Sequence, residues 1–164
     1  MMRIVTIGVY GFTEETFFQA LQDAGVDVLW DIRLRRGVRG ATYAFANSQR
    51  LQKRLAELGI AYRHVKELAP THAIRERQYA ADKSAKVAKR QRTQLDPAFI
   101  QAYREGVLVR FDPQTLPDAL PADAQVIALL CVEREPAACH RSLVAEHLRT
   151  ALGWPVEHLL PPGG

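Results

Sequence analysis

The sequence predicts an α/β fold in a single domain: a mainly parallel sheet with helices on both faces, in three layers. Two observations predict it. Strand-like and helix-like segments alternate along the chain, and strand-like segments such as 125–131 are apolar throughout instead of alternating with polar residues. Parallel strands that helices cover on both faces have this pattern. Because 164 residues suit one domain, we expect the domain to span 1–160 and a tail to span 161–164.

Apolar runs and capping residues place the individual elements. Thr13 is expected to start the first helix and Asn47 or Ser48 the second, while Asp96 starts a later one. The region 67–94 is predicted to be helical and peripheral, packing through the small residues Ala81, Ala85 and Ala88. The last helix is expected over 140–152. The predicted strands are 3–8, 26–33, 60–65, 125–131 and 156–160.

The composition indicates an ordinary packed core in a reducing compartment. The chain is 48% hydrophobic and 24% charged, as in average globular domains. Its two cysteines, Cys131 and Cys139, are too few for a disulfide framework. The first residues lead directly into a strand-like segment, and no apolar run reaches the length of a membrane helix. We therefore expect a cytoplasmic protein with no membrane partner.

Positive charge gathers in two segments, although the formal net charge is only +4. Residues 33–39 carry four arginines without an acid, and 75–92 carry seven bases against two acids. Together the segments could form a surface that attracts phosphates; the alternative is a solvated helix face and a basic loop. The candidate nucleic-acid-binding residues are Arg35, Arg36, Arg39, Lys83, Lys86, Lys89, Arg90 and Arg92.

Polar residues follow several of the predicted strands. In an open parallel sheet, ligands bind outside the carboxyl ends of the strands. The first strand leads to Gly8 and Tyr10, the second to Asp31 and Arg33, and the third to His64. The fourth leads to a longer set: Cys131, Glu133, Cys139, His140, Arg141 and Ser142. We expect this edge to hold the working site.

The segment 131–142 offers several kinds of chemistry. A cysteine close to a helix N-terminus and to cations has a lowered pKa and reacts as a nucleophile, which fits Cys139 better than Cys131. Cys131 could instead simply finish a buried strand. Arg33 and Arg141 suit phosphate binding, together with Gly8, Tyr10 and Ser142. Proton transfer would fall to Asp31 or Glu133, although Asp31 could instead pair with Arg33 or Arg141. His140 completes the set of candidate catalytic residues.

A metal site is the competing interpretation of the same cysteines. Cys131, Cys139 and His140 could join His64 or His72, but cysteines eight positions apart match no common zinc spacing. Nucleotide-binding glycine motifs and a serine nucleophile elbow are missing from the sequence. We therefore expect no cofactor, with zinc as the alternative.

Five short motifs recur around the ends and starts of the predicted strands. They are Thr6-Ile7-Gly8, Asp31-Ile32-Arg33, Gly59-Ile60-Ala61-Tyr62, Cys131-Val132-Glu133 and Cys139-His140-Arg141-Ser142. Together they resemble a widespread, mainly prokaryotic family, the domain of unknown function 488, over most of the chain. The resemblance implies an α/β domain with motif residues at strand ends, and it brings no established reaction. A proline often found after the Asp-x-Arg motif is missing from 34–37, and the basic stretch 75–92 resembles an elaboration of a subgroup.

Three functional hypotheses follow from the sequence. The leading one is a small enzyme for a phosphate-bearing substrate, a nucleotide or nucleic acid, and it predicts that Arg141→Ala abolishes ligand binding without unfolding the protein. The second is a nucleic-acid-binding or regulatory module without catalysis, whose affinity falls steeply with salt. The third is a zinc-stabilised scaffold. The oligomeric state is left open by the sequence.

Overall fold

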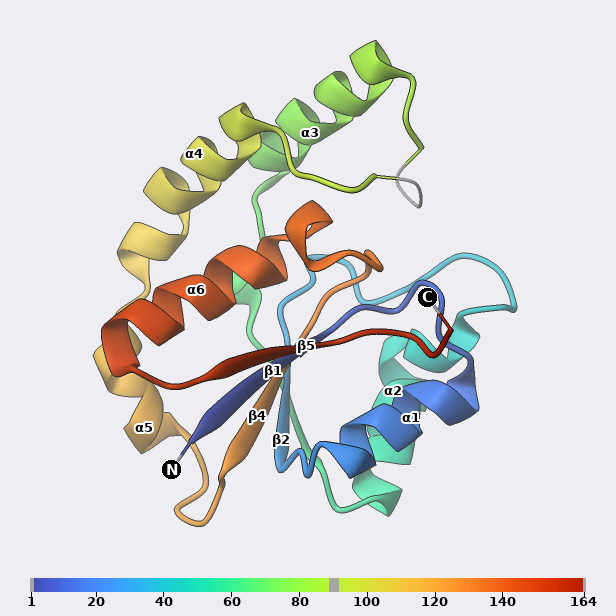
Figure 1. Cartoon of the computed structure of the whole chain (residues 1–164), viewed down its shortest axis with the longest axis vertical. Helices are drawn as coiled ribbons and strands as arrows, with labels where there is room; N and C mark the ends of the chain where they lie inside the picture. The colour runs from blue at the N-terminus through green and yellow to red at the C-terminus, as the bar shows by residue number, and fades with distance from the viewer. Residues whose placement is uncertain (1, 89–91, 164) are drawn as a thin grey trace.

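Five parallel strands form one sheet in the order β3-β2-β4-β1-β5. Figure 1 shows the strands with helices on either side. The structure is a computed structural model, and it describes residues 2–88 and 92–163. The predicted strands are confirmed, each with slightly shorter bounds. They are β1 (Arg3–Ile7), β2 (Val28–Asp31), β3 (Ala61–His64), β4 (Val126–Leu130) and β5 (Val156–Leu159).

Helices cover both faces of the sheet, which confirms the three-layer prediction. One apolar cluster joins α1 and α2 to alternate residues of β4 such as Ala128 and Leu130, and a second joins α4, α5 and α6 to Ile127 and Leu129. Every residue of β4 is buried, so its continuous apolar sequence reflects packing on two sides. The helices are α1 (Glu14–Asp23), α2 (Ser48–Glu57), α3 (His72–Ala85), α4 (Pro97–Gly106), α5 (Leu116–Ala119) and α6 (His140–Leu152).

Two predicted helix starts differ in how their capping residues act. Thr13 forms a reciprocal capping box with Thr16 at the start of α1. Asn47 occupies the N-cap position of α2, but its side chain makes no capping hydrogen bond. Its Oδ1 instead accepts from the backbone N–H of Val38 at 2.7 Å. Asn47 thus anchors the arginine-rich loop that follows β2.

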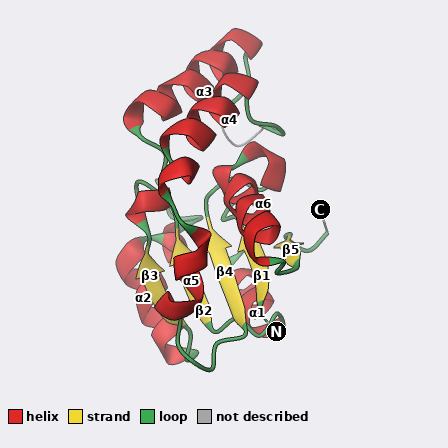
Figure 2. Ribbon diagram, turned by 90° about the vertical axis from the view of Figure 1, so that its left-hand side faces the viewer, coloured by secondary structure: helices red, strands yellow, loops and turns green. Residues whose placement is uncertain are grey.

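Helices α3 and α4 stand beyond the carboxyl end of the sheet (Figure 2). The predicted alanine packing face on α3 is wrong, because Ala85 and Ala88 are exposed while Ile74 and Gln78 are buried. Gln78 is buried because it is hydrogen-bonded: its amide donates to Asp82, and its oxygen accepts from the backbone N–H of Asp96. A polar side chain therefore provides the packing contact that was predicted for the alanines.

The C-terminal residues are not all free of the domain. Pro161, which we expected to begin a tail, is buried. A methyl group built on Gly11 would lie 2.8 Å from the Pro161 ring, so the two residues are in close contact. Within residues 2–88 and 92–163, no helix is both long and apolar enough to cross a membrane.

Candidate functional site

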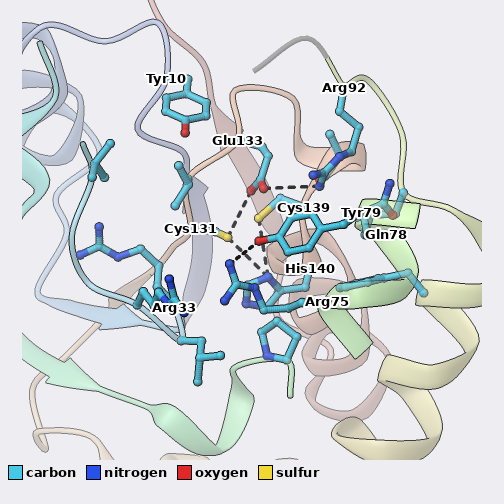
Figure 3. A pocket seen from close by; sticks show the side chains of 18 of the residues that line it. Tyr10, Arg33, Arg75, Gln78, Tyr79, Arg92, Cys131, Glu133, Cys139 and His140 are labelled. Carbon is cyan, nitrogen blue, oxygen red and sulfur yellow. Dashed lines mark hydrogen bonds and ion pairs between the residues drawn. The ribbon is translucent and has the colours of Figure 1, made fainter. Parts of the chain in front are cut away.

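A cavity of about 380 Å³ lies at the carboxyl ends of β2 and β4, next to α3 (Figure 3). Its walls come from the loop after β1, the loop after β2, α3, and the segment between β4 and α6. Parallel α/β sheets bind ligands at this edge. The polar and ionisable residues that line it are Tyr10, Arg33, Arg35, Arg39, Arg75, Gln78, Tyr79, Arg92, Cys131, Glu133, Cys139 and His140.

Asp31 and Arg33 form a fully buried ion pair at the end of β2. Arg33 Nε donates to Asp31 Oδ1 and Nη2 donates to Oδ2, both at 2.8 Å, and the Tyr62 hydroxyl donates to Oδ2 at 2.7 Å. The oxygens of Asp31 are therefore engaged, and Asp31 is not among the residues that line the cavity. This geometry indicates that Asp31 positions Arg33, whereas the sequence suggested a role in proton transfer.

One nitrogen of the Arg33 guanidinium remains without a protein partner. Arg33 is 2% exposed, and its buried Nη1 has no hydrogen-bond partner among the described residues. A buried charged donor left unpaired costs free energy, so such a group is a candidate ligand contact. Arg33 also lines the cavity, which makes its guanidinium group a candidate for the predicted anion site.

Arg141 lies outside the cavity, which corrects its predicted role. It is fully buried, and its guanidinium donates to the backbone oxygens of Glu133 and Arg134 and to Thr6 Oγ1. These contacts fix the loop that follows β4 against β1. Its nitrogens are therefore engaged by the protein, and Arg141 positions this loop instead of offering a contact to an anion in the cavity.

Gly8 and Ser142, also predicted to bind an anion, do not line the cavity either. A methyl group on Gly8 would lie 1.9 Å from the Glu133 carbonyl oxygen. The absence of a side chain at Gly8 therefore allows the loop after β4 to approach β1. The Ser142 hydroxyl donates to the backbone oxygen of Cys139 at 2.9 Å. Both residues shape the backbone around the site. Tyr10 does line the cavity, where its ring lies 5.2 Å from that of Tyr43.

Cys131, Cys139 and His140 form one buried cluster on the cavity wall. The Nδ1 atom of His140 lies 3.4 Å from Cys131 Sγ and 3.9 Å from Cys139 Sγ. On the other side of the ring, His140 Nε2 lies 2.8 Å from the backbone oxygen of Ile32. Because a carbonyl only accepts, Nε2 carries a hydrogen, and Nδ1 is the nitrogen that exchanges a proton with the sulfurs.

The surroundings drive the pKa values of the two thiols apart. Burial, the hydrogen bond and negative charge of Cys139, and the charge of Glu133 together raise the pKa of Cys131 well above its ordinary value. Burial alone would also raise the pKa of Cys139, but the hydrogen bond from Cys131 and the charge on His140 lower it well below the ordinary value. Cys139 is also the N-cap residue of α6, where an anion is favoured. The cluster thus favours a thiolate on Cys139 and a thiol on Cys131.

His140 responds to the same thiolate. Burial would lower the pKa of His140, but the charge and hydrogen bond of Cys139, together with the Ile32 carbonyl, raise the pKa above the ordinary value. A nucleophile beside an acid–base group that a third group orients is the arrangement of cysteine-dependent enzymes. The cluster can therefore carry a nucleophile and a proton donor side by side.

Glu133 and Arg92 close the other side of the cluster. Glu133 Oε2 accepts from the Cys131 thiol at 3.4 Å, and Oε1 lies 3.4 Å from Arg92 Nη1. Arg92 also pairs with Asp82 at 2.9 Å and donates to the backbone oxygen of Ala138. It is buried, so it joins α3 to the site and is not part of an exposed nucleic-acid-binding surface as predicted.

The three side chains Cys131, Cys139 and His140 could also hold a metal ion, because their ligand atoms all lie within 4.8 Å of one another. The predicted partners His64 and His72 are not in this group. His64 Nε2 lies 2.8 Å from the Arg33 carbonyl oxygen, and His72 is exposed at the start of α3. Structural zinc sites take four protein ligands, and the described residues supply three here.

The other predicted basic residues divide by position. Arg35 and Arg39 are exposed and line the cavity. Arg36 is half-buried and donates to the Tyr62 hydroxyl at 3.4 Å. Lys83 and Lys86 are exposed and do not line the cavity. Lys89 and Arg90 lie outside the described residues. The two basic segments, distant in sequence, therefore meet at one cavity through Arg35, Arg39, Arg75 and Arg92.

Arg75, Gln78 and Tyr79 of α3 were not among the predicted site residues. Arg75 donates to the Tyr79 hydroxyl and lies 5.4 Å from the centre of its ring. Tyr62, which holds Asp31, was also missed. Arg75 and Tyr79 are four positions apart and so share one face of the helix, a signal that the sequence contained.

Comparisons with known proteins give a family but no characterised relative. No significant match was found among curated proteins or among solved structures. The model of one family, described as the domain of unknown function DUF488, matches residues 13–148. This range includes the Asp31–Arg33 pair and the whole of the cysteine–histidine cluster. The chain therefore belongs to the domain of unknown function DUF488 family.

Proposed function

We propose that this protein is an enzyme that acts on a phosphate-bearing substrate through the Cys139 thiolate. One observation carries the proposal: arginines from two distant segments and the cysteine–histidine cluster line the same cavity at the carboxyl edge of the sheet. An anion drawn to the arginines would lie beside a nucleophile. Neither feature alone would distinguish a binding protein from an enzyme.

The anion would bind at the guanidinium groups of Arg33 and Arg75, two residues that line the cavity. Asp31 and Tyr62 hold the Arg33 guanidinium in place, so the side chain loses little conformational freedom when the guanidinium donates a hydrogen bond to a ligand. Arg75 contacts a neutral hydroxyl, so that contact leaves its charge uncompensated. Arg35 and Arg39 add positive charge to the wall. Phosphate oxygens are well matched to such guanidinium groups.

The cysteine–histidine cluster would then carry out the transfer of the phosphoryl group. The Cys139 sulfur attacks the phosphorus atom, an S–P bond forms, and the bond from phosphorus to the leaving oxygen breaks. His140 gives its Nδ1 proton to that oxygen. Water then displaces the sulfur and gives its proton to His140, so that phosphate is released and Cys139 is again a thiolate. The Ile32 carbonyl keeps the ring of His140 oriented for both transfers.

A substrate panel tests the proposal. Purified protein under reducing conditions is incubated with sugar phosphates, nucleoside mono-, di- and triphosphates and short oligonucleotides, and released phosphate is measured. We expect turnover of at least one class, and a loss on the order of a thousandfold in Cys139→Ser. Arg110→Gln removes an exposed charge that does not line the cavity and should leave the rate unchanged. Absence of turnover across the panel, or full activity in Cys139→Ser, contradicts the proposal.

A non-catalytic nucleic-acid-binding module is the second candidate, because both basic segments contribute exposed side chains. Arg35, Arg39, Lys83 and Lys86 are the residues that remain for it. Binding of an oligonucleotide without turnover, with affinity falling steeply as salt rises, would favour this candidate. A four-residue variant of these positions should then lose both the affinity and the salt dependence.

A further inference from the structure

We propose that Cys131 and Cys139 form a reversible thiol–disulfide couple, in which a hydroperoxide oxidises Cys139 and Cys131 completes the disulfide. The inference concerns the same site as the proposed function and adds a modification to it. The two sulfurs belong to a group of atoms that all lie within 4.8 Å of one another, and both residues line the cavity. A small oxidant that enters the cavity therefore meets both.

The geometry gives the two cysteines different parts. Cys139 ends the short helix η6 (Pro136–Ala138) and caps α6, whereas Cys131 follows β4 directly. The intervening loop folds back, so residues eight apart in sequence face each other. A disulfide needs the sulfurs at about 2 Å, so closing the bond requires the two side chains to turn toward each other. Arg141 holds the loop from the other side, which keeps Cys139 and Cys131 as neighbours.

The proton distribution sets the order of events. The lowered pKa of Cys139 makes it the attacking thiolate, and the raised pKa of Cys131 keeps it a thiol until it is needed. Glu133 accepts the hydrogen of that thiol at 3.4 Å. His140 Nδ1 faces both sulfurs and can carry a proton between them.

The steps balance with a hydroperoxide as the only added reagent. The Cys139 thiolate attacks one peroxide oxygen, the O–O bond breaks, and Cys139 becomes a sulfenic acid while hydroxide leaves and takes a proton from His140. The Cys131 thiol loses its proton to the sulfenic hydroxyl, its sulfur attacks Cys139 Sγ, and water leaves. Two electrons pass from the two sulfurs to the peroxide, and a dithiol reductant reverses the change.

A bound metal is the main competing state of the cluster. A bound metal would require both cysteines to be thiolates. It would also place a cation close to buried guanidinium groups. Arg92 lies 3.4 Å from Glu133, and Arg141 acts electrostatically on both cysteines. These positive charges favour an anionic sulfur and oppose a divalent cation. The pair is therefore better suited to exchange electrons than to coordinate zinc.

Mass spectrometry of the intact protein tests the inference. Wild-type protein is reduced, freed of reductant and treated with one equivalent of hydrogen peroxide, and its remaining thiols are alkylated. We expect both thiols to disappear together with a mass loss of about 2 Da, and dithiothreitol to restore both. Treated with two equivalents of hydrogen peroxide, Cys131→Ser should instead accumulate Cys139 sulfinic acid, about 32 Da heavier and not restored by dithiothreitol. Cys139→Ser should keep its remaining thiol reduced at the same dose.

Several outcomes would overturn the inference. One is wild-type protein in which Cys139 over-oxidises while Cys131 stays reduced. Another is a purified protein that holds stoichiometric zinc and whose thiols resist peroxide until a chelator is added. The wild-type measurement stands even if a variant fails to fold. Because it needs no substrate, it can succeed while the phosphate-release panel fails, and a panel run under reducing conditions can succeed without a disulfide.

Discussion

The ends of β2 and β4 lie side by side at one edge of the sheet but handle charge in opposite ways. At the end of β2, Asp31 and Arg33 form a buried ion pair with little freedom, which Tyr62 and the backbone complete. At the end of β4, Cys131, Cys139 and His140 share protons between atoms 3.4 to 3.9 Å apart. The end of β2 therefore holds a charge in a fixed position, whereas the cluster at the end of β4 can transfer a proton.

This difference separates binding from chemistry. A fixed guanidinium with one unpaired nitrogen can hold an anion but cannot attack it. A thiol pair with divergent pKa values can react but has no means of its own to hold an anion. The start of α6 connects the two, because Ile32, between Asp31 and Arg33, accepts the hydrogen bond of His140. Variants at the two strand ends should therefore fail in different ways.

Breaking the ion pair at β2 should cause the largest loss of stability. Asp31→Ala leaves Arg33 buried without its carboxylate, which typically costs about 3–5 kcal/mol. The control is Glu157→Ala, which removes an exposed partner of Arg3 and should cost less than about 1 kcal/mol. Urea unfolding of both variants measures the difference. Equal, small losses would mean that the pair is not buried as described.

Arg141→Met should lower stability by a smaller amount. Methionine keeps much of the packing but leaves the Glu133 and Arg134 carbonyls without their donor, at a cost of about 2–4 kcal/mol. This replaces the sequence-based expectation that Arg141 binds the ligand directly. Chemical unfolding together with pyrophosphate binding measures both effects. A variant of unchanged stability that had lost its affinity for pyrophosphate would restore the original expectation.

Removing the charge at His140 should shift the ionisation of Cys139. The pKa of Cys139 is lowered, so its thiolate persists as the pH falls below the range in which ordinary cysteines titrate, and is lost only as the pH falls through the lowered pKa. His140→Gln removes the positive charge, so the pKa should rise and the thiolate should be lost at higher pH. The pH titration of the thiolate is followed by its ultraviolet absorbance, with Cys139→Ser as the blank. An unchanged titration would show that His140 does not control the thiolate.

The sequence predicted the sheet, and it predicted that motif residues would gather at its carboxyl edge, because both depend on local pattern. The last helix spans His140–Leu152 as expected, and the motif residues of β2 and β4 meet at one edge. Patterns of this kind identify elements, and parallel connectivity then brings their ends together.

The pairing of polar groups at that edge could not be predicted in the same way. Asp31 had two candidate partners, and only the fold shows that it holds Arg33 while Arg141 binds carbonyl groups. The spacing of Cys131 and Cys139 matched no common zinc pattern, yet the loop between them brings their sulfurs and a His140 nitrogen within 4.8 Å of one another. The alanines of α3 suggested a packing face, but hydrogen bonds bury Gln78 instead. Each of these outcomes depends on contacts between distant segments.

The most direct test of a cavity that binds a phosphate-bearing ligand is the affinity for pyrophosphate, measured by calorimetry in wild-type protein, Arg75→Gln and Arg110→Gln. Both variants remove one positive charge, but only Arg75 lines the cavity. We predict that the wild-type protein binds, that Arg75→Gln weakens binding about tenfold or more, since a charged hydrogen bond contributes roughly 1.5–3 kcal/mol, and that Arg110→Gln binds like the wild type. Equal weakening in both variants, or no binding by the wild-type protein, would contradict a specific anion site beside Cys139.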